Sequence, residues 1–464
     1  MKSYPMIAVL AVVIAVLLLL DRHRPDILLY QTECETIDSL RTYTFVIGNH
    51  KSNPANAKTE RYESEALGFG KVLLYVQRDS TRALPQTGDT IITRTRIRRG
   101  GQIGSFDYGL YLRRQGVIGT AYVWNYELKE SGNRPLPSLQ ERLYSRLAAS
   151  GLSGDELATT GALTLGYKED LDPELRHRFQ ASGAAHVLAV SGLHTGIIYA
   201  LLIGLLTLGG RIRPRHENIF GRCLVGSIII ATMVFYAWLT GMTPSVVRCV
   251  VMITMVETGK MLYRYSPTLN TIAAAAVLIL LVRPLDLWSV SFQLSFAATA
   301  AIVVMAKDAE HELHRLDWRN SLQGKAFSWI AGTIIVSLAA QLGTLPITMY
   351  TFGQVSNYFL LTNLIVLPIA AFLVPCGLAG VALGGTLIGR ITGFATHALA
   401  WTMNHSVGWI ESLPGSCSDV QISLPMAFLL YAAMAMGWLT IHKSLWWVIG
   451  VIASVTTFCI SYTL

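Results

Sequence analysis

Long apolar runs separated by short polar segments fill the second half of this chain. They lie at about 185–209, 223–241, 246–262, 268–282, 287–306, 327–350, 356–376, 378–400, 424–441 and 444–463, and a further run spans about 5–20. A helix needs about 20 mainly apolar residues to cross a bilayer. The pattern therefore predicts a polytopic α-helical membrane protein with about eleven transmembrane helices. Residues 401–412, with aromatic or histidine side chains every fourth position, predict an interfacial amphipathic helix instead of a crossing.

Residues 21–183 are polar and contain no run long enough to span a membrane. Four segments, at 42–47, 71–78, 89–99 and 119–128, are rich in β-branched and aromatic residues and are separated by turn-forming sequences. They predict strands of a small β-barrel that follows the first membrane helix. We expect this barrel to lie outside the cytoplasm.

Two of the predicted strands alternate informatively. On one strand Ile91, Thr93, Thr95 and Ile97 share a face, and Arg94, Arg96 and Arg98 share the other; on a second strand Tyr122, Trp124 and Tyr126 share a face. Arginines that track phosphates and aromatics that stack on bases form surfaces for single-stranded nucleic acid. Aromatic side chains also fill barrel cores, and arginines are often simply solvated, so both interpretations stay open.

A helical period follows the predicted strands. Leu139, Leu143 and Leu147 repeat every four residues, with Arg142 and Arg146 beside them, which predicts an amphipathic helix that suits a membrane surface. The predicted organisation is a transmembrane anchor at 1–20, a β domain at 21–130, an amphipathic helical connector at 131–183 and a transmembrane domain at 184–464.

Composition and charge agree with a membrane protein. The 464 residues are 52% hydrophobic and 14% charged, whereas soluble chains are about 25% charged. The mean hydropathy is +0.44. Short cytoplasmic loops are enriched in lysine and arginine. Three loops that lie two spans apart, and so on the same side of the membrane, carry such residues. This predicts a cytoplasmic N-terminus, an extracytoplasmic β domain and an extracytoplasmic C-terminus. The basic residues are Arg211, Arg213, Arg215 and Arg222 in the first loop, Lys260 and Arg264 in the second, and Lys307, Arg315, Arg319 and Lys325 in the third.

The segment 186–196 opens the apolar run 185–209 with polar residues, namely His186, Ser191 and His194, together with Gly192 and Gly196. Ionisable groups in membrane helices usually face a bundle interior or a wet path. Three interpretations remain. Ser191 and His194 act as a hydrolytic pair, they pack helices together by close approach and hydrogen bonding, or they line a translocation path at a broken helix.

Further polar side chains interrupt other apolar runs, and we include them as candidate path residues. They are Arg248, Gln293, Gln341 and Asn363. An intramembrane arginine contacts a passing phosphate or pairs with a carboxylate, and Asp286 is the plausible partner. The amide side chains line a wet channel or form interhelical hydrogen bonds.

Several catalytic motifs are absent from the sequence. There is no GxxxxGK[ST] nucleotide-binding loop, no HxHxDH-type zinc cluster and no CxxC pair. We therefore expect no catalytic residues, no metal and no cofactor in this chain. Among the six cysteines, Cys34 and Cys417 lie in polar segments and pair only if both face an oxidising compartment.

Five segments together resemble a known family. Residues 162–198 (ALTLGYKEDLDPELRHRFQASGAAHVLAVSGLHTGII) resemble the signature of the ComEC/Rec2 competence proteins, and 106–123, 244–255, 286–296 and 341–368 match in the same order. The resemblance covers nearly the whole chain. It implies that the β domain is OB-like and that 184–464 is a competence-type channel domain.

The resemblance also implies a function. Members of this family are bacterial inner-membrane channels that translocate single-stranded DNA into the cytoplasm during natural transformation. The expected partners are single-stranded DNA, membrane lipid, and a separate DNA receptor, nuclease and cytoplasmic translocase ATPase. The metallo-β-lactamase-like domain of many members has no counterpart here, so we expect strand degradation by another protein. A transporter of a small solute or lipid precursor on the same fold is the alternative.

Overall fold

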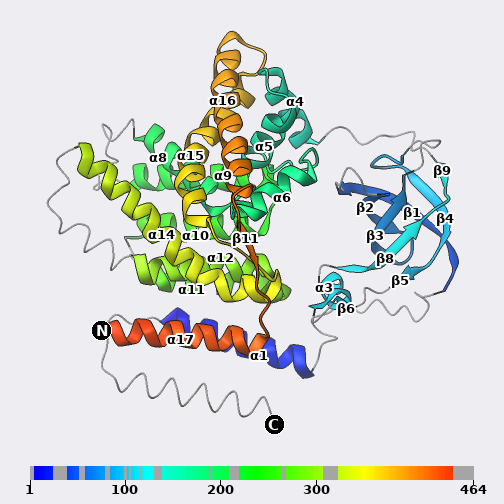
Figure 1. Ribbon diagram of the computed structural model, residues 1–464, viewed down its shortest axis with the longest axis horizontal. Coiled ribbons are helices and arrows are strands. Elements are labelled where there is room, and N and C mark those ends of the chain that lie inside the picture. The colour runs from blue at the N-terminus through cyan, green and yellow to red at the C-terminus, as the bar shows by residue number, and fades with distance from the viewer. Residues whose placement is uncertain are drawn as a thin grey trace. The chain divides into compact units, whose positions relative to one another are not determined.

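The computed structural model describes residues 5–23, 39–51, 58–78, 84–98, 102–103, 106–114, 116–129, 138–188, 190–207, 219–263, 268–306 and 322–442. The chain divides into two compact units. Unit 1 comprises Met1–Phe179, Ala185–Leu287 and Val366–Val407, and unit 2 comprises Gln180–Ala184, Trp288–Ile365 and Gly408–Leu464. Most described elements are helices, and the strands gather near the N-terminus (Figure 1).

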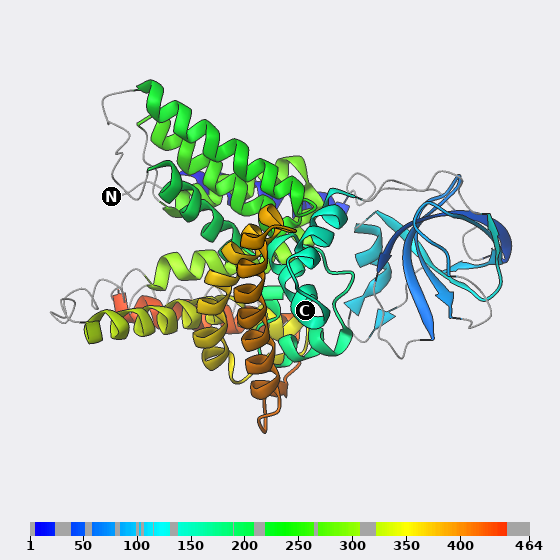
Figure 2. The same ribbon diagram turned by 90° about the horizontal axis from the view of Figure 1, so that it is seen from above.

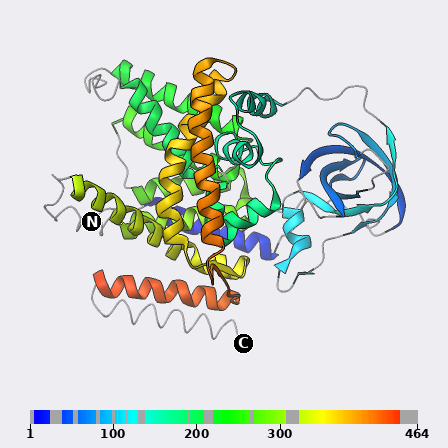
Figure 3. The ribbon, with the colours of Figure 1, turned by 45° about the horizontal axis from the view of Figure 1, so that its top comes forward.

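The β region of unit 1 is a closed barrel. Its strands, in a seven-stranded sheet of order β5-β8-β3-β2-β1-β4-β9, are β1 (Arg41–Lys51), β2 (Thr59–Ala66), β3 (Gly70–Gln77), β4 (Thr90–Thr95), β5 (Ile97–Arg98), β8 (Val117–Val123) and β9 (Glu127–Lys129). Only Arg96 separates β4, which pairs with β1, from β5, which pairs with β8. The β4–β5 segment therefore pairs with β1 through β4 and with β8 through β5, and the strands curl around a common interior (Figures 2 and 3).

Alternating side chains fill the barrel interior. Fully or almost fully buried residues from each main strand form one cluster: Tyr43, Phe45, Ile47, Tyr62, Ala66, Val72, Leu74, Val76, Ile91, Ile97, Ala121 and Val123. The predicted alternation on 91–98 is confirmed, because Ile91, Thr93, Thr95 and Ile97 are buried while the intervening arginines are exposed. This period of two gives the barrel an apolar interior, while on the outer face Leu73 is buried in a second apolar cluster with Leu112 and Val117, against which Tyr75 packs.

All four predicted strand segments contain strands, but the sequence prediction missed β2. That strand reads TERYESEA, and its outward positions are charged. Its buried positions include Glu60, Tyr62 and Ser64 instead of aliphatic residues, so it lacks the usual β-strand composition. A two-stranded sheet of β6 (Gln102–Ile103) and β7 (Phe106–Asp107) and the helix α3 (Tyr108–Arg114) precede β8.

The connector contains three helices, α4 (Leu139–Ala149), α5 (Gly154–Thr164) and α6 (Pro173–Ala181). A capping box between Ser138 and Glu141 begins α4. Leu147 is fully buried, and a Cβ built at Gly380 would lie 3.4 Å from it. The C-terminal end of α4 therefore packs against protein, whereas Leu139 at its N-terminal end is exposed, so the predicted leucine face is not uniformly open to a membrane surface. Glycines on the facing helices permit this close approach.

Unit 1 also holds most of the apolar helices. They are α1 (Pro5–His23), α7 (Ala185–Leu188), α8 (Gly192–Leu206), α9 (Ile219–Leu239), α10 (Pro244–Met261), α11 (Thr268–Val282), the 3-10 helix η1 (Pro284–Trp288) and much of α15 (Phe359–Leu383) and α16 (Leu387–Glu411). A short turn joins α9 to α10, and the two pack side by side (Figure 2). The helix α10 also contacts α8 and α11.

Unit 2 contains α12 (Val290–Ala301), the π-helix η2 (Ile302–Ala306), α14 (Leu322–Thr351), α17 (Leu424–His442) and a hairpin of β10 (Gln354–Ser356) with β11 (Cys417–Asp419). Gly343 of α14 lies where a Cβ would come within 2.7 Å of the Ala297 carbonyl of α12. The Tyr431 hydroxyl of α17 donates a hydrogen bond of 2.7 Å to the Gly343 carbonyl. Small residues and one carbonyl thus hold three helices together.

Three of the described helices are long and apolar enough to cross a membrane, namely 219–239, 327–351 and 359–383, and five shorter apolar helices accompany them. The predicted separate helix at 401–412 is wrong, because α16 runs without a break from Leu387 to Glu411. The break falls at Gly384–Thr386, where Gly385 adopts a φ of +83° that favours glycine. The predicted run 444–463 lies outside the described residues.

Candidate functional site

The polar segment at 186–194 forms a break between two helices. The helix α7 ends at Leu188, and α8 begins at Gly192 with Ser191 as an extended N-cap at φ −110° and ψ 175°. The Ser191 backbone N–H donates to Nδ1 of His194 over 3.0 Å. His186 is exposed on α7, whereas His194 is fully buried. The helix is thus interrupted just before Gly192, whereas Gly192 and Gly196 themselves lie within α8.

The start of α10 packs against this break. Ser245 donates a hydrogen bond of 2.8 Å to the Val190 carbonyl. A Cβ built at Gly192 would lie 2.8 Å from Sγ of Cys249. Arg248 shares this side of α10 and is only 2% exposed. The structure thus gathers Ser191, His194 and Arg248 on two contacting helices of unit 1.

The hydrogen bonds of His194 define its tautomer. Because Nδ1 accepts the Ser191 N–H, the neutral ring carries its proton on Nε2. Nε2 is buried and has no hydrogen-bond partner among the described residues. A buried donor without an acceptor is costly. This N–H is therefore suited to a polar group that enters the break.

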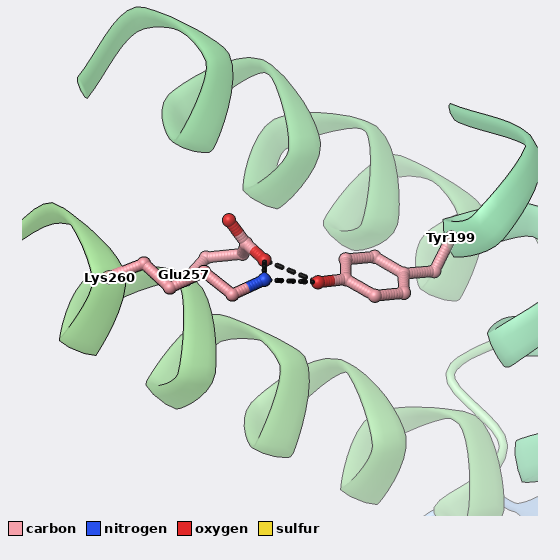
Figure 4. Close-up of polar contacts among 3 residues, drawn as sticks. All are labelled: Tyr199, Glu257 and Lys260. Carbon is pink, nitrogen blue, oxygen red and sulfur yellow. Dashed lines mark hydrogen bonds and ion pairs between the residues drawn. The ribbon is translucent and has the colours of Figure 1, made fainter. Parts of the chain in front are cut away.

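A second polar cluster links α8 to α10 further along both helices. The Tyr199 hydroxyl donates to the Glu257 carboxylate, and Lys260 Nζ lies 2.7 Å from the same Glu257 oxygen and 2.9 Å from the Tyr199 oxygen (Figure 4). Sequence reasoning missed Tyr199 and Glu257, and it assigned Lys260 to a loop, whereas Lys260 lies in the last turn of α10. Glu257 and Lys260 stand inside the apolar run 246–262, and two ionisable residues there were a usable signal.

The remaining candidate path residues belong to unit 2. Gln293 lies on α12, Gln341 on α14 and Asn363 at the start of α15, and all three are half-buried. The helices α12 and α14 pack together, whereas α14 carries Pro346 and α15 carries Pro368 and Pro375 within their lengths. Prolines inside helices free backbone carbonyls and kink the axis.

The arginines predicted to bind nucleic acid lie on the outer face of the barrel. Arg94, Arg96 and Arg98 are all exposed. Thr95 donates to the Tyr122 carbonyl over 2.7 Å and Ile97 pairs with Ala121, which places Arg96 beside Tyr122 on the outside. Five of the six predicted nucleic-acid-binding residues therefore share the outer face, and the sixth does not.

Of the three aromatic residues predicted to share a strand face, two are exposed and the third is turned inward by a bend in the backbone. Tyr122 and Trp124 are 45% and 68% exposed, whereas Tyr126 packs against the barrel core. The strand β8 ends at Val123, and the irregular backbone before β9 turns Tyr126 inward. The prediction that all three share a face is therefore wrong for Tyr126.

The sequence prediction missed two members of the outer surface. Tyr75 of β3 stacks on Tyr122 with ring centroids 4.8 Å apart, and Arg61 of β2 pairs with Tyr75 across the sheet. Arg61, Tyr75, Tyr122 and Arg96 thus form a row across neighbouring strands, which we call the outer row. Burial, followed by the neighbouring Tyr75, raises the pKa of nearby Tyr108 to about 12, so this phenol adds no negative charge there.

Within the described residues no three His, Cys, Asp or Glu side chains are arranged to hold a metal ion. Cys417 is a free thiol, and Cys34 lies outside the described residues. The chemistry offered by the barrel surface is cationic and aromatic, and the chemistry offered by the helix break is hydrogen-bond donation. Both suit a polyanion with planar bases.

The chain is similar to several bacterial proteins, among them the following three. ComE operon protein 3 of Bacillus subtilis (strain 168) is 28% identical over 327 residues, which cover 69% of this chain and 38% of that protein. Uncharacterized protein YcaI of Escherichia coli (strain K12) is 29% identical over 229 residues, 49% of this chain and 29% of that protein. Recombination protein 2 of Haemophilus influenzae is 24% identical over 233 residues, 49% of this chain and 28% of that protein.

The match thus spans well under two thirds of the length of these relatives. No solved structure matches the chain. A family model described as competence protein matches residues 163–445, which include the helix break, the Tyr199 cluster and the membrane-length helices. Because this match covers more than half of the chain and contains the features built above, the chain belongs to the competence protein family.

Proposed function

We propose that this protein is an inner-membrane channel that passes single-stranded DNA into the cytoplasm during natural transformation. The observation that carries the proposal is the outer row of the barrel, two stacked tyrosines flanked by arginines, in a chain of the competence protein family. Base stacking tolerates every sequence, and arginines neutralise phosphates. A membrane protein that takes up DNA of any sequence needs this combination.

The barrel topology supports its assignment as an OB-like domain. An antiparallel β1–β2–β3 meander, a parallel β3–β8 pair and a β4–β5 strand that closes the sheet form a five-membered Greek-key barrel with β9 as an addition. Such barrels bind oligonucleotides on their outer strands and loops. Arg94, Arg96, Arg98, Tyr122 and Trp124 would meet the DNA strand, whereas Tyr126 would support the barrel.

The path across the membrane would use the helix break of unit 1, and unit 2 offers candidate path residues of its own. His186, Ser191, His194 and Arg248 would line it in unit 1, and Gln293, Gln341 and Asn363 in unit 2. Broken or kinked helices at membrane depth are tolerated where they line a cavity or are covered by protein. In this proposal the charged and amide groups hold the phosphates weakly enough for the strand to move on.

The proposed topology places the N-terminus in the cytoplasm and both the barrel and the C-terminus outside. A reporter fused after Leu464 should then be active only outside the cytoplasm, and one fused near Arg215 only inside it. A cytoplasmic signal at Leu464 would mean an even number of crossings and would overturn this orientation.

The proposal assigns no covalent chemistry to this chain. His194 turns Nδ1 toward Ser191, and no carboxylate bonds its Nε2 among the described residues, so the pair does not match a hydrolytic triad. A separate DNA receptor, a nuclease for the other strand and a cytoplasmic translocase ATPase would complete the machinery.

Transformation of a deletion strain tests the proposal. At equal DNA load, deletion should reduce transformants to the background of spontaneous mutants, and the wild-type chain supplied in trans should restore them. Labelled DNA should still bind the cell surface but should no longer enter the cytoplasm. Normal transformation without the protein, with a defect in growth on one solute instead, would favour a small-solute transporter.

A further inference from the structure

The Tyr199, Glu257 and Lys260 side chains join two helices that also meet at the helix break. Glu257 is 5% exposed on α10, and Tyr199 extends toward it from α8 (Figure 4). Lys260 neutralises the carboxylate at 2.7 Å, and its Nζ also donates to Tyr199 over 2.9 Å. Each of the three groups therefore contacts the other two, and breaking one of these interactions leaves a buried charge less well paired.

The cluster lies on the same two helices as the candidate path. Tyr199 follows Ser191 by about two helical turns on α8. At the N-terminal end of α8, Gly192 approaches Cys249, and Ser245 bonds Val190. The helix α8 is thus fixed to α10 at its first turn and again at Tyr199. A shift of α8 against α10 at Tyr199 would move Ser191 and His194 with it.

We propose that Tyr199, Glu257 and Lys260 form an interhelical latch that positions the first turn of α8 in the path. The contacts between the helices are both made by the Tyr199 hydroxyl, which donates to Glu257 and accepts from Lys260, whereas the Glu257–Lys260 ion pair lies within α10 and holds these two partners in place. Its consequence for uptake rests on the proposed function, whereas the latch itself is a property of α8 and α10. Tyr199, Glu257 and Lys260 act in this proposal as positioning residues.

A built-in reporter measures the position of α8. A Cβ at Gly192 would lie 2.8 Å from Sγ of native Cys249, so Gly192→Cys should form a disulfide with Cys249 when the full chain in membranes is treated with copper phenanthroline. The linked peptide is identified by mass spectrometry. The initial rate of this reaction reports how often the first turn of α8 lies against α10.

In the Gly192→Cys background, Tyr199→Phe should slow disulfide formation by about 3- to 10-fold, the effect of losing an interhelical hydrogen bond in a membrane. Glu257→Gln keeps an accepting oxygen for Tyr199 but removes the charge that holds Lys260, so it should slow the reaction less. The charge-reversed double variant Glu257→Lys with Lys260→Glu should restore most of the rate. Tyr431→Phe is the matched control, because it removes a tyrosine bond of 2.7 Å within unit 2 and should leave the rate unchanged.

Transformation by the same variants without Gly192→Cys is the second readout, and it should fall with Glu257→Gln and recover with the charge-reversed pair. An unchanged disulfide rate in Tyr199→Phe, inserted at normal amount, would overturn the latch, as would an equal fall in Tyr431→Phe. A slower disulfide with normal transformation would overturn the positioning role. If the deletion strain transforms normally, the proposed function fails while the disulfide result still decides the latch.

Discussion

The barrel and the helical membrane region are built with opposite arrangements of polar and apolar groups. In the barrel, Phe45 is fully buried and Arg96 is exposed. In the helical region, Arg248 is 2% exposed and Phe394 is 77% exposed. Water surrounds the first, so burial of apolar surface stabilises it. Lipid surrounds the second, so apolar side chains face outward and polar groups must satisfy one another inside.

This difference determines which side chains of each region a polyanion could contact without a change in structure. The barrel presents its arginines and aromatics on the outside, and a strand of DNA would bind there without any opening. The helical region keeps Arg248 and His194 inside, so a strand would reach them only after helices separate. Contacts such as the Tyr199–Glu257 bond between α8 and α10 are therefore expected to matter more in the second region than single surface charges do in the first.

The largest expected effect concerns the barrel interior. Phe45→Ala should lower the free energy of unfolding of the barrel by about 3–5 kcal/mol, because it leaves a cavity in a closed core. Trp124→Ala on the outer face should change it by less than about 0.5 kcal/mol. Thermal unfolding followed by near-ultraviolet circular dichroism of residues 39–129 compares the two. Equal destabilisation would mean that Trp124 belongs to the core.

In the helical region the equivalent test uses two glycines of α14. Gly343→Val should destabilise unit 2 by about 1–3 kcal/mol, because a Cβ there meets the Ala297 carbonyl at 2.7 Å. Gly332→Val is the matched control, since a Cβ there meets nothing within 4 Å. The temperature of aggregation in detergent measures both. Greater loss with Gly332→Val would contradict the packing of α12 on α14.

A smaller effect sharpens the role of the outer face. Changing Arg94, Arg96 and Arg98 together to Gln should reduce the slope of log affinity against log salt by about 2 for single-stranded oligonucleotides, because each phosphate that an arginine neutralises adds about 0.7 to the slope. Titration of the full chain in nanodiscs at several salt concentrations gives the slope. An unchanged slope would remove this face from the DNA route and leave the barrel with a structural role.

The smallest effect distinguishes a path residue from a nucleophile. Ser191→Ala should lower transformation by less than about 10-fold, since it removes only a hydroxyl contact of 3.3 Å to His194. His194→Leu should impair uptake more while the protein stays inserted. Complete loss with Ser191→Ala, together with fluorophosphonate labelling of the wild type at Ser191, would establish hydrolysis instead.

Burial could be predicted from the sequence where polar and apolar residues alternate regularly along a strand of the water-exposed barrel. The alternation from Ile91 to Arg98 predicted which side chains are buried, because one face of a barrel strand meets water and the other meets the core. The strand β2 was not predicted because its inward positions include the polar residues Glu60 and Ser64. Tyr126 was misplaced because a bend after Val123 breaks the period of two.

Prediction was weaker in the helices, where most positions are apolar all around. The break at Ser191 was visible because polar residues and glycines interrupt an apolar run. The continuity of α16 was not predicted, because its tryptophans suggested a helix at the membrane interface. The opposite face of this helix, with Met403 and Val407, is fully buried in protein. The Tyr199–Glu257 bond joins two helices across 58 positions of sequence, and periodicity carries no information about such pairs.

Site-specific photo-crosslinking tests the central claim most directly, namely that the polar interior of the helical region carries the DNA strand. A photoreactive amino acid would replace Ser191, or Phe394 on the outward face of α16 as the control, in cells that are taking up labelled DNA. The proposal predicts that illumination links DNA to the protein with the photoreactive amino acid at position 191 and not to the protein with it at position 394. Crosslinks at Phe394 alone, or at neither position while transformation proceeds normally, would contradict a path through the helix break.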